Sequence, residues 1–123
     1  MQHVTIETGR RLKDAGFPQP EKPEIGQAWL FSFLPDTVLV IGSQVEGLIP
    51  WGGLFHAAET FLPTATDIMQ HLPGWNLCYQ KNEWVAWADL GTDREPEYVT
   101  FENDNPAESV AKAWFFEQAT QKK

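Results

Sequence analysis

The chain has 123 residues, of which 42% are hydrophobic and 13% aromatic, enough apolar material for a folded core and too much for a disordered chain. Seventeen acidic against nine basic residues give a formal charge of −8, which argues against direct binding to nucleic acid or to an anionic membrane. A single cysteine, Cys78, forms no internal disulfide, and no apolar run is long enough to span a bilayer, so we expect a cytoplasmic protein.

The N-terminal part of the chain is predicted to form a helix and then a hairpin. Thr5 suits the N-cap of a helix and Gly16 suits the position just beyond its end, so a helix of about three turns fits between them. Gly26 to Phe33 and Thr37 to Ile41 are rich in aromatic and β-branched residues. They predict two antiparallel strands that turn at Leu34-Pro35-Asp36, because proline and aspartate are typical turn residues.

A glycine-rich segment, Gly47 to Gly53, predicts an irregular loop with Trp51 at its centre. A large aromatic ring between flexible glycines is suited to contact a ligand, although loop tryptophans often fold back onto the core. We expect a short strand over Phe55 to Phe61 after this loop.

The second predicted helix begins at a capping box, in which Thr64 is the N-cap and Asp67 is the third helical residue. Pro73-Gly74 ends it. The apolar residues between them recur at the spacing of an amphipathic helix, and they are Ala65, Ile68, Met69 and Leu72.

A second hairpin is predicted from Trp75 to Gln80 and from Glu83 to Ala88, with Lys81-Asn82 as its turn. A two-residue turn sets the register and gathers one apolar face from both strands. The expected pairs are Tyr79 with Trp84, Leu77 with Ala86 and Trp75 with Ala88. The opposite face, which carries Trp87, has a mixed character that indicates partial exposure or a site.

The last two elements are a strand over Glu97 to Phe101 and a helix from Pro106 to about Ala119. Asn105 suits the N-cap and Glu108 the reciprocal position of a capping box. At about 100° per residue, Phe116 points away from the broad arc of the other apolar residues of this helix. It is therefore either a contact residue or a cover over a neighbouring loop.

These elements predict one α+β domain over residues 1–123, with a mainly antiparallel sheet made of two hairpins and a final strand. Three helices pack on the sheet, and the C-terminal helix comes last.

Three stretches carry a family resemblance: Thr5 to Gln19, Pro63 to Ile68, and Asn105 to Glu108 with Ala111 and Trp114. Together they resemble a group of short uncharacterised bacterial and phage or prophage proteins. In that group the first helix more often has Ala where this chain has Gly9, and the second hairpin often turns through Asn-Gly where this chain has Lys81-Asn82. The resemblance implies a setting among mobile or accessory genes and supplies no activity or catalytic residue.

Few residues offer chemistry. His56 and Glu59, with Asp67 or His71, are possible metal ligands by type, but the second histidine of a zincin motif is missing. Cys78 has no nucleophile signature around it and fits better as a small packed residue of a strand. We therefore assign no catalytic residue, no metal ligand and no cofactor.

An acidic run near the C-terminus is interrupted only by Arg94, and it consists of Asp93, Glu95, Glu97, Glu102, Asp104 and Glu108. Its simplest interpretation is a solvated surface. An alternative is that it imitates the charge of a nucleic acid and occupies a basic protein.

The function favoured by the sequence is a non-enzymatic accessory protein that acts through contact with another protein or with a second copy of itself. The candidate binding residues are Trp51, His56, Trp87 and Phe116. The alternative is a small-molecule-binding domain or enzyme with a pocket between the Trp51 loop and the 75–88 hairpin.

Overall fold

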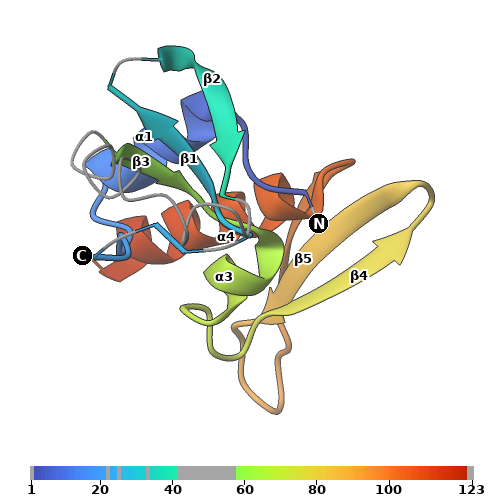
Figure 1. The fold of residues 1–123 in the computed structure, drawn as a ribbon. Coiled ribbons are helices and arrows are strands. Elements are labelled where there is room, and N and C mark those ends of the chain that lie inside the picture. The colour runs from blue at the N-terminus through green and yellow to red at the C-terminus, as the bar shows by residue number, and fades with distance from the viewer. Residues whose placement is uncertain (1, 22, 25, 33, 42–57, 122–123) are drawn as a thin grey trace. The chain divides into compact units, whose positions relative to one another are not determined.

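The computed structural model describes residues 2–21, 23–24, 26–32, 34–41 and 58–121 (Figure 1). The chain divides into two units, one formed by Thr5–Pro63 and the other by Met1–Val4 with Thr64–Lys123. Each unit contains a three-stranded antiparallel sheet, and the described residues also form three helices, of which the C-terminal one comes last. The predicted α+β class is confirmed. That the two units make one domain stays a prediction.

Helix α1 spans Ile6–Asp14 in the Thr5–Pro63 unit, and both of its predicted ends are confirmed. Thr5 Oγ1 accepts the Thr8 N–H at 3.2 Å. At the other end Gly16 has a φ of +94°, and the Phe17 N–H donates to the Leu12 carbonyl at 2.8 Å. This is the bond pattern of a glycine-terminated helix, and it brings Phe17 onto the buried Leu12.

The sheet of this unit has the order β2-β1-β3, with β1 at Ala28–Phe31, β2 at Leu34–Val40 and β3 at Ala58–Leu62. The predicted hairpin is present, but Leu34-Pro35-Asp36 lies inside β2 and is not the turn. Proline is tolerated there because residues 35–37 have no partner on β1 at an irregularity of the ladder. The Pro35 carbonyl accepts a hydrogen bond from Arg10 Nη2 at 2.8 Å. The pairing of β1 shifts register between Leu30 and Phe31.

The predicted strand over 55–61 is observed as β3, which begins at Ala58 and ends at Leu62. Phe55 and the loop Gly47 to Gly53 lie outside the described residues. Gln19 fixes β3 from the side, because its Oε1 accepts the Phe61 N–H at 2.9 Å.

Helix α3, at Ala65–Met69, opens the other unit with the predicted capping box. Asp67 Oδ2 accepts the Thr64 N–H at 2.9 Å, and Thr64 Oγ1 accepts the Asp67 N–H at 3.4 Å. The helix stops three residues before Leu72, because the next amides bond three residues back in tighter turns, as in Leu72 N–H to the Met69 carbonyl.

The second sheet has the order β4-β5-β6, with β4 at Asn76–Gln80, β5 at Glu83–Asp89 and β6 at Tyr98–Asn103. Lys81 and Asn82 have φ values of 52° and 66°, as a two-residue type I′ turn requires. The predicted pairs of Tyr79 with Trp84 and of Leu77 with Ala86 are confirmed. Trp75 precedes β4 and has no partner in the ladder. Its N–H donates to the Leu72 carbonyl.

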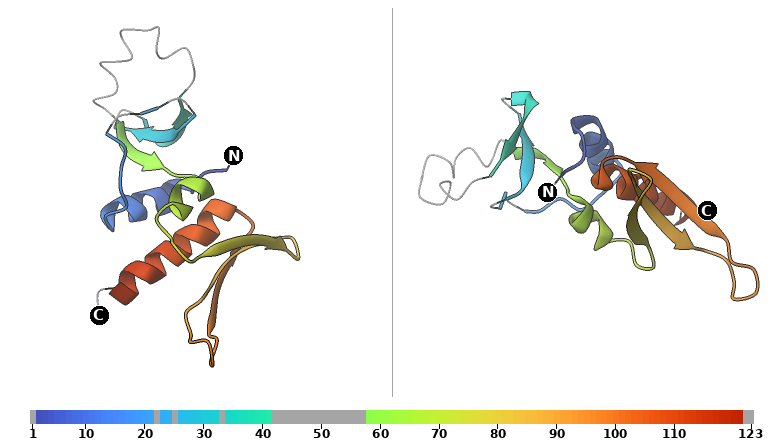
Figure 2. Two further views of the ribbon diagram at one scale, coloured as in Figure 1. Left: turned by 90° about the horizontal axis from the view of Figure 1, so that it is seen from below. Right: turned by 90° about the vertical axis from the view of Figure 1, so that its right-hand side faces the viewer.

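Helix α4, at Pro106–Gln121, packs against β5 and β6 (Figure 2). Its N-cap is confirmed, because Asn105 Oδ1 accepts the Ala107 N–H at 2.9 Å. The Asn105 N–H donates to Asn103 Oδ1, also at 2.9 Å. That acceptor takes the place that a capping box gives to Glu108.

Candidate functional site

The β4-β5-β6 sheet has two faces of different character, because side chains alternate along each strand. The inner face packs against α4, and its β5 residues Ala86 and Ala88 are 0% and 1% exposed. The outer face points the other way. We define it by the strand residues of opposite parity, which are Asn76, Cys78, Gln80, Glu83, Val85, Trp87, Asp89, Tyr98, Thr100 and Glu102.

An aromatic pair lies on the outer face. Trp87 on β5 and Tyr98 on β6 are diagonal neighbours, since Trp87 pairs with Thr100 and Asp89 pairs with Tyr98. Their ring centroids are 6.1 Å apart at an interplanar angle of 60°, the edge-to-face contact that aromatic rings prefer. Trp87 is half-buried and Tyr98 is 64% exposed. The pair is thus held in one geometry while one ring stays open to solvent.

The inner face contains a second ring cluster, formed by Trp75, Phe101 and Phe116. Their centroids lie 5.7 to 6.1 Å apart, and Trp75 Nε1 donates to Glu117 Oε1 at 2.7 Å. Phe116 is half-buried in this cluster. It therefore lies on the opposite side of the sheet from Trp87, and the two predicted binding residues do not share a surface.

The other two candidate binding residues, Trp51 and His56, lie outside the described residues. The predicted pocket between the Trp51 loop and the 75–88 hairpin lies outside them for the same reason, and it stays a prediction. Within the described ranges, no group of three or more His, Cys, Asp and Glu side chains is placed to hold a metal ion. Asp67 is engaged in the capping box of α3.

Asp89, an acidic residue that precedes the acidic run, has a structural role at the end of β5. Asp89 Oδ1 accepts the Gly91 and Glu97 N–H groups at 3.0 and 2.9 Å, and so organises the loop between β5 and β6. A Cβ at Gly91 would overlap the Glu95 carbonyl oxygen, which explains the glycine. The side chains of residues 93–97 are exposed and leave a mostly acidic margin beside Tyr98.

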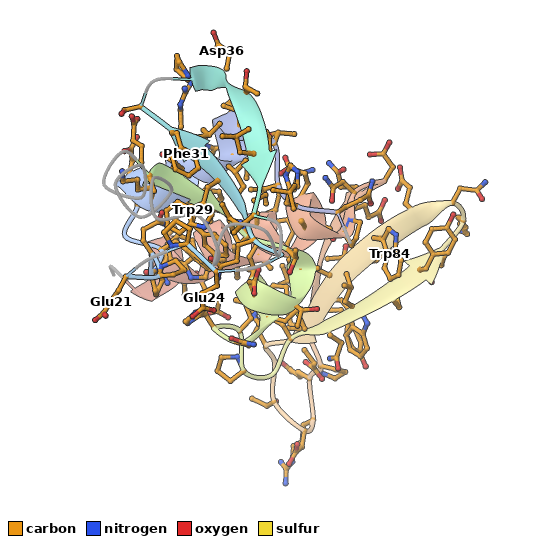
Figure 3. All side chains as sticks on the ribbon, viewed as in Figure 1. Glu21, Glu24, Trp29, Phe31, Asp36 and Trp84 are labelled. Carbon is orange, nitrogen blue, oxygen red and sulfur yellow. The ribbon has the colours of Figure 1, made fainter. Side chains whose placement is uncertain are left out.

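Another exposed ring lies near the tip of the β4–β5 hairpin. Tyr79 is 57% exposed and meets Trp84 edge-on, with ring centroids 5.1 Å apart at 63°. Figure 3 shows Trp84 on β5. This pair belongs to the inner-face parity, near the turn that closes the hairpin.

Sequence reasoning selected Trp87 but missed Tyr98, its neighbour on the outer face. The last strand was predicted without a register against β5, and only that register places Tyr98, Thr100 and Glu102 beside Trp87. The exposure pattern of β6 alternates accordingly. A strict alternation of Tyr98, Thr100 and Glu102 with Val99 and Phe101 was the available signal in the sequence.

The chain matches no protein-family model, no curated protein and no solved structure. In the part of the chain that the structure describes, no helix has both the length and the apolar character needed to cross a bilayer.

Proposed function

We propose that this protein is a non-enzymatic accessory protein, in the bacterial or phage setting that the resemblance implies, and that it acts by binding another protein. The outer face of the β4-β5-β6 sheet is the contact surface. The observation that carries this proposal is the Trp87–Tyr98 pair, a fixed aromatic contact on a sheet face with Tyr98 64% exposed.

The composition of the outer face supports a protein partner. Aromatic side chains provide large, rigid contact area and are the residues on which binding energy concentrates in protein interfaces. Trp87 lies on the central strand, and exposed polar side chains lie beside it on the neighbouring strands, at Asn76, Thr100 and Glu102. An apolar centre with a polar rim is the usual anatomy of such a contact.

The charge around the outer face indicates the chemistry of the partner. Glu83, Asp89 and Glu102 are exposed members of the face, and residues 93–97 add three acidic groups against Arg94. Complementary charge speeds encounter and suppresses wrong partners more than it adds affinity. The partner we expect presents lysine or arginine side chains around an apolar recess that receives Tyr98.

The test compares substitutions on the outer face with a matched substitution elsewhere. Tyr98→Ser removes the exposed ring, and Thr100→Arg places a bulky side chain opposite Trp87 without touching the buried face. Val40→Ser is the control, because Val40 is 63% exposed on another sheet. Affinity capture from the native host followed by mass spectrometry identifies the partner, and titration calorimetry with the purified partner measures the affinity.

We expect both outer-face variants to weaken binding at least tenfold, a loss of about 1.4 kcal/mol, and the control to bind like the unmodified protein. Equal affinity for all four proteins would reject the outer face as the contact surface. A protein that binds a metabolite stoichiometrically and captures no protein would reject the function itself.

A further inference from the structure

The two edges of the β4-β5-β6 sheet differ in charge. Edge strand β6 carries Glu102 and is flanked by Glu97 and Asp104, whereas edge strand β4, Asn76–Gln80, carries no charged residue. Proteins commonly place charge on an exposed edge to prevent pairing with another strand. Among the described residues no strand pairs with the far side of β4. As far as the described residues extend, the sheet is therefore protected by charge at β6 and open at β4.

The backbone groups that β4 offers can be identified from the ladder. The residues that flank a two-residue turn form a hydrogen-bonded pair, and such pairs alternate with non-bonded ones. Gln80 and Glu83 flank the turn, so Gln80, Cys78 and Asn76 point their N–H and C=O groups toward β5. Leu77 and Tyr79 point theirs outward.

The β5–β6 ladder gives the same parity independently. The Leu90 N–H donates to the Glu97 carbonyl at 2.8 Å, which makes Ala88 and Ala86 the next residues of β5 that bond to β6. The backbone groups of Val85 and Trp87 consequently face β4, opposite Cys78 and Asn76.

We propose that β4 pairs antiparallel with β4 of a second copy of this chain, about a two-fold axis at Cys78, to form a continuous six-stranded sheet. In this register Leu77 bonds with Tyr79 of the second copy, and Tyr79 bonds with Leu77 of the second copy. All four outward N–H groups, two from each chain, then find a carbonyl partner. Addition of a strand to an exposed edge is a common mode of protein association.

Neighbouring registers leave some of the outward N–H and C=O groups of Leu77 and Tyr79 without a partner. A shift by two residues pairs Leu77 or Tyr79 with itself and brings in Trp75 or Lys81 as the next bonding residue. The Trp75 N–H already donates to the Leu72 carbonyl at 3.2 Å, and Lys81 lies in the turn with a φ of 52°. The Cys78-centred register is therefore the one that the free backbone groups select.

The side chains of β4 fit a second copy in this register. Tyr79, which is 57% exposed, would pack against Leu77 of the second copy on the inner-face side. On the outer-face side the amides of Asn76 and Gln80 would lie opposite each other. Pairing of two β4 strands opposes no like charges, because β4 contains no charged residue. Pairing of two β6 strands would bring acidic groups together.

Pairing at β4 places both outer faces on the same side of the six-stranded sheet. Directly opposed residues of paired strands point to one face, so two Trp87–Tyr98 pairs would then present one larger surface. The proposed dimer depends only on the edge of β4, so its test does not depend on whether the outer face binds another protein.

Cys78 is the only cysteine of the chain, which makes the register directly testable. Opposed residues of a non-bonded antiparallel pair have Cα atoms about 4.5 Å apart, within the roughly 4.4–6.8 Å that a disulfide needs. Mild oxidation with diamide, which takes up the two electrons and two protons released by the thiols, is expected to link two chains in high yield. The control moves the thiol to another exposed position, as Cys78→Ser with Gln80→Cys, which would face Asn76 of the second copy and cross-link at least tenfold more slowly.

Light scattering with size exclusion tests the association without any covalent step. We expect twice the chain mass of 14.0 kDa, and more dimer as salt is raised, since salt screens the repulsion between two chains of charge −8. Cys78→Lys places like charges across the axis and is expected to give a monomer with an unchanged circular dichroism spectrum. A monomer at 100 µM unmodified protein, or equal cross-linking at residues 78 and 80, would overturn the proposal.

Discussion

The two sheets of this protein bury their central strands differently. Every residue of β1 is at most 5% exposed, from Ala28 to Phe31, so both faces of this strand are covered. On β5, by contrast, the outer-face residue Trp87 remains half-buried although Val85 on the same face is 3% exposed, and β6 alternates between exposed and half-buried residues. A strand covered on both faces contributes to stability alone, whereas a sheet with one covered face keeps the other for contact. This contrast is consistent with the proposal that the outer face is the contact surface.

The largest expected effect comes from emptying a position on the fully covered strand. Phe31 is 0% exposed on β1, so Phe31→Ala is expected to lower the free energy of unfolding by about 3–5 kcal/mol. Tyr98→Ala on the outer face is the matched aromatic truncation and should change it by no more than about 0.5 kcal/mol. Urea denaturation followed by circular dichroism measures both. Similar losses of unfolding free energy for the two variants would contradict the difference between the covered strand β1 and the outer face.

An intermediate effect is expected on the covered face of the β4-β5-β6 sheet. Glu117→Ala removes the acceptor of Trp75 Nε1, and loss of a hydrogen bond to a charged group costs about 1.5–3 kcal/mol. Glu117→Gln retains an oxygen acceptor and should recover more than half of that loss. If neither Glu117→Ala nor Glu117→Gln lowers the free energy of unfolding in urea, the Trp75–Glu117 hydrogen bond does not hold the inner ring cluster to α4.

The smallest expected effect is a gain in stability at the regular hairpin. Lys81 and Asn82 both adopt left-handed backbone angles, which asparagine and glycine accept more readily than lysine. Changing the pair to Asn-Gly should raise the thermal midpoint, with a gain of about 0.5–1 kcal/mol. Calorimetry measures the thermal midpoint. The single change Lys81→Ala is the control, because alanine at this left-handed position is not expected to give the gain. A loss of stability in the Asn-Gly variant would contradict the type I′ turn.

Local signals in the sequence predicted most of the secondary structure. The N-caps Thr5, Thr64 and Asn105 were predictable because a cap requires only a short side chain beside its own helix. The register of the β4–β5 hairpin was predictable because a two-residue turn fixes it. The predicted turn at 34–36 was wrong because these residues belong to β2, where an irregularity of the ladder leaves Pro35 without a partner that would need its missing N–H.

The candidate site could be predicted only in part. Trp87 was selected from the mixed face of its hairpin, whereas the assignment of Tyr98 needed the β5–β6 register across a loop of eight residues, Leu90 to Glu97. Phe116 was predicted to be either a contact residue or a cover over a neighbouring loop. Its ring contacts with Trp75 and Phe101 come from residues far away in the chain, and no local pattern encodes them.

By itself the sequence determined where helices begin, which residues turn the second hairpin, and the α+β class, since each of these follows from interactions within a few residues. Only the tertiary structure decided that the strands divide into two sheets, that α4 covers one face of the second sheet, and that Glu117 receives the Trp75 N–H from 42 residues away. The physical reason is distance along the chain. Caps and turns are local bonds, but which face of a sheet stays open depends on how all the covering elements share the buried area.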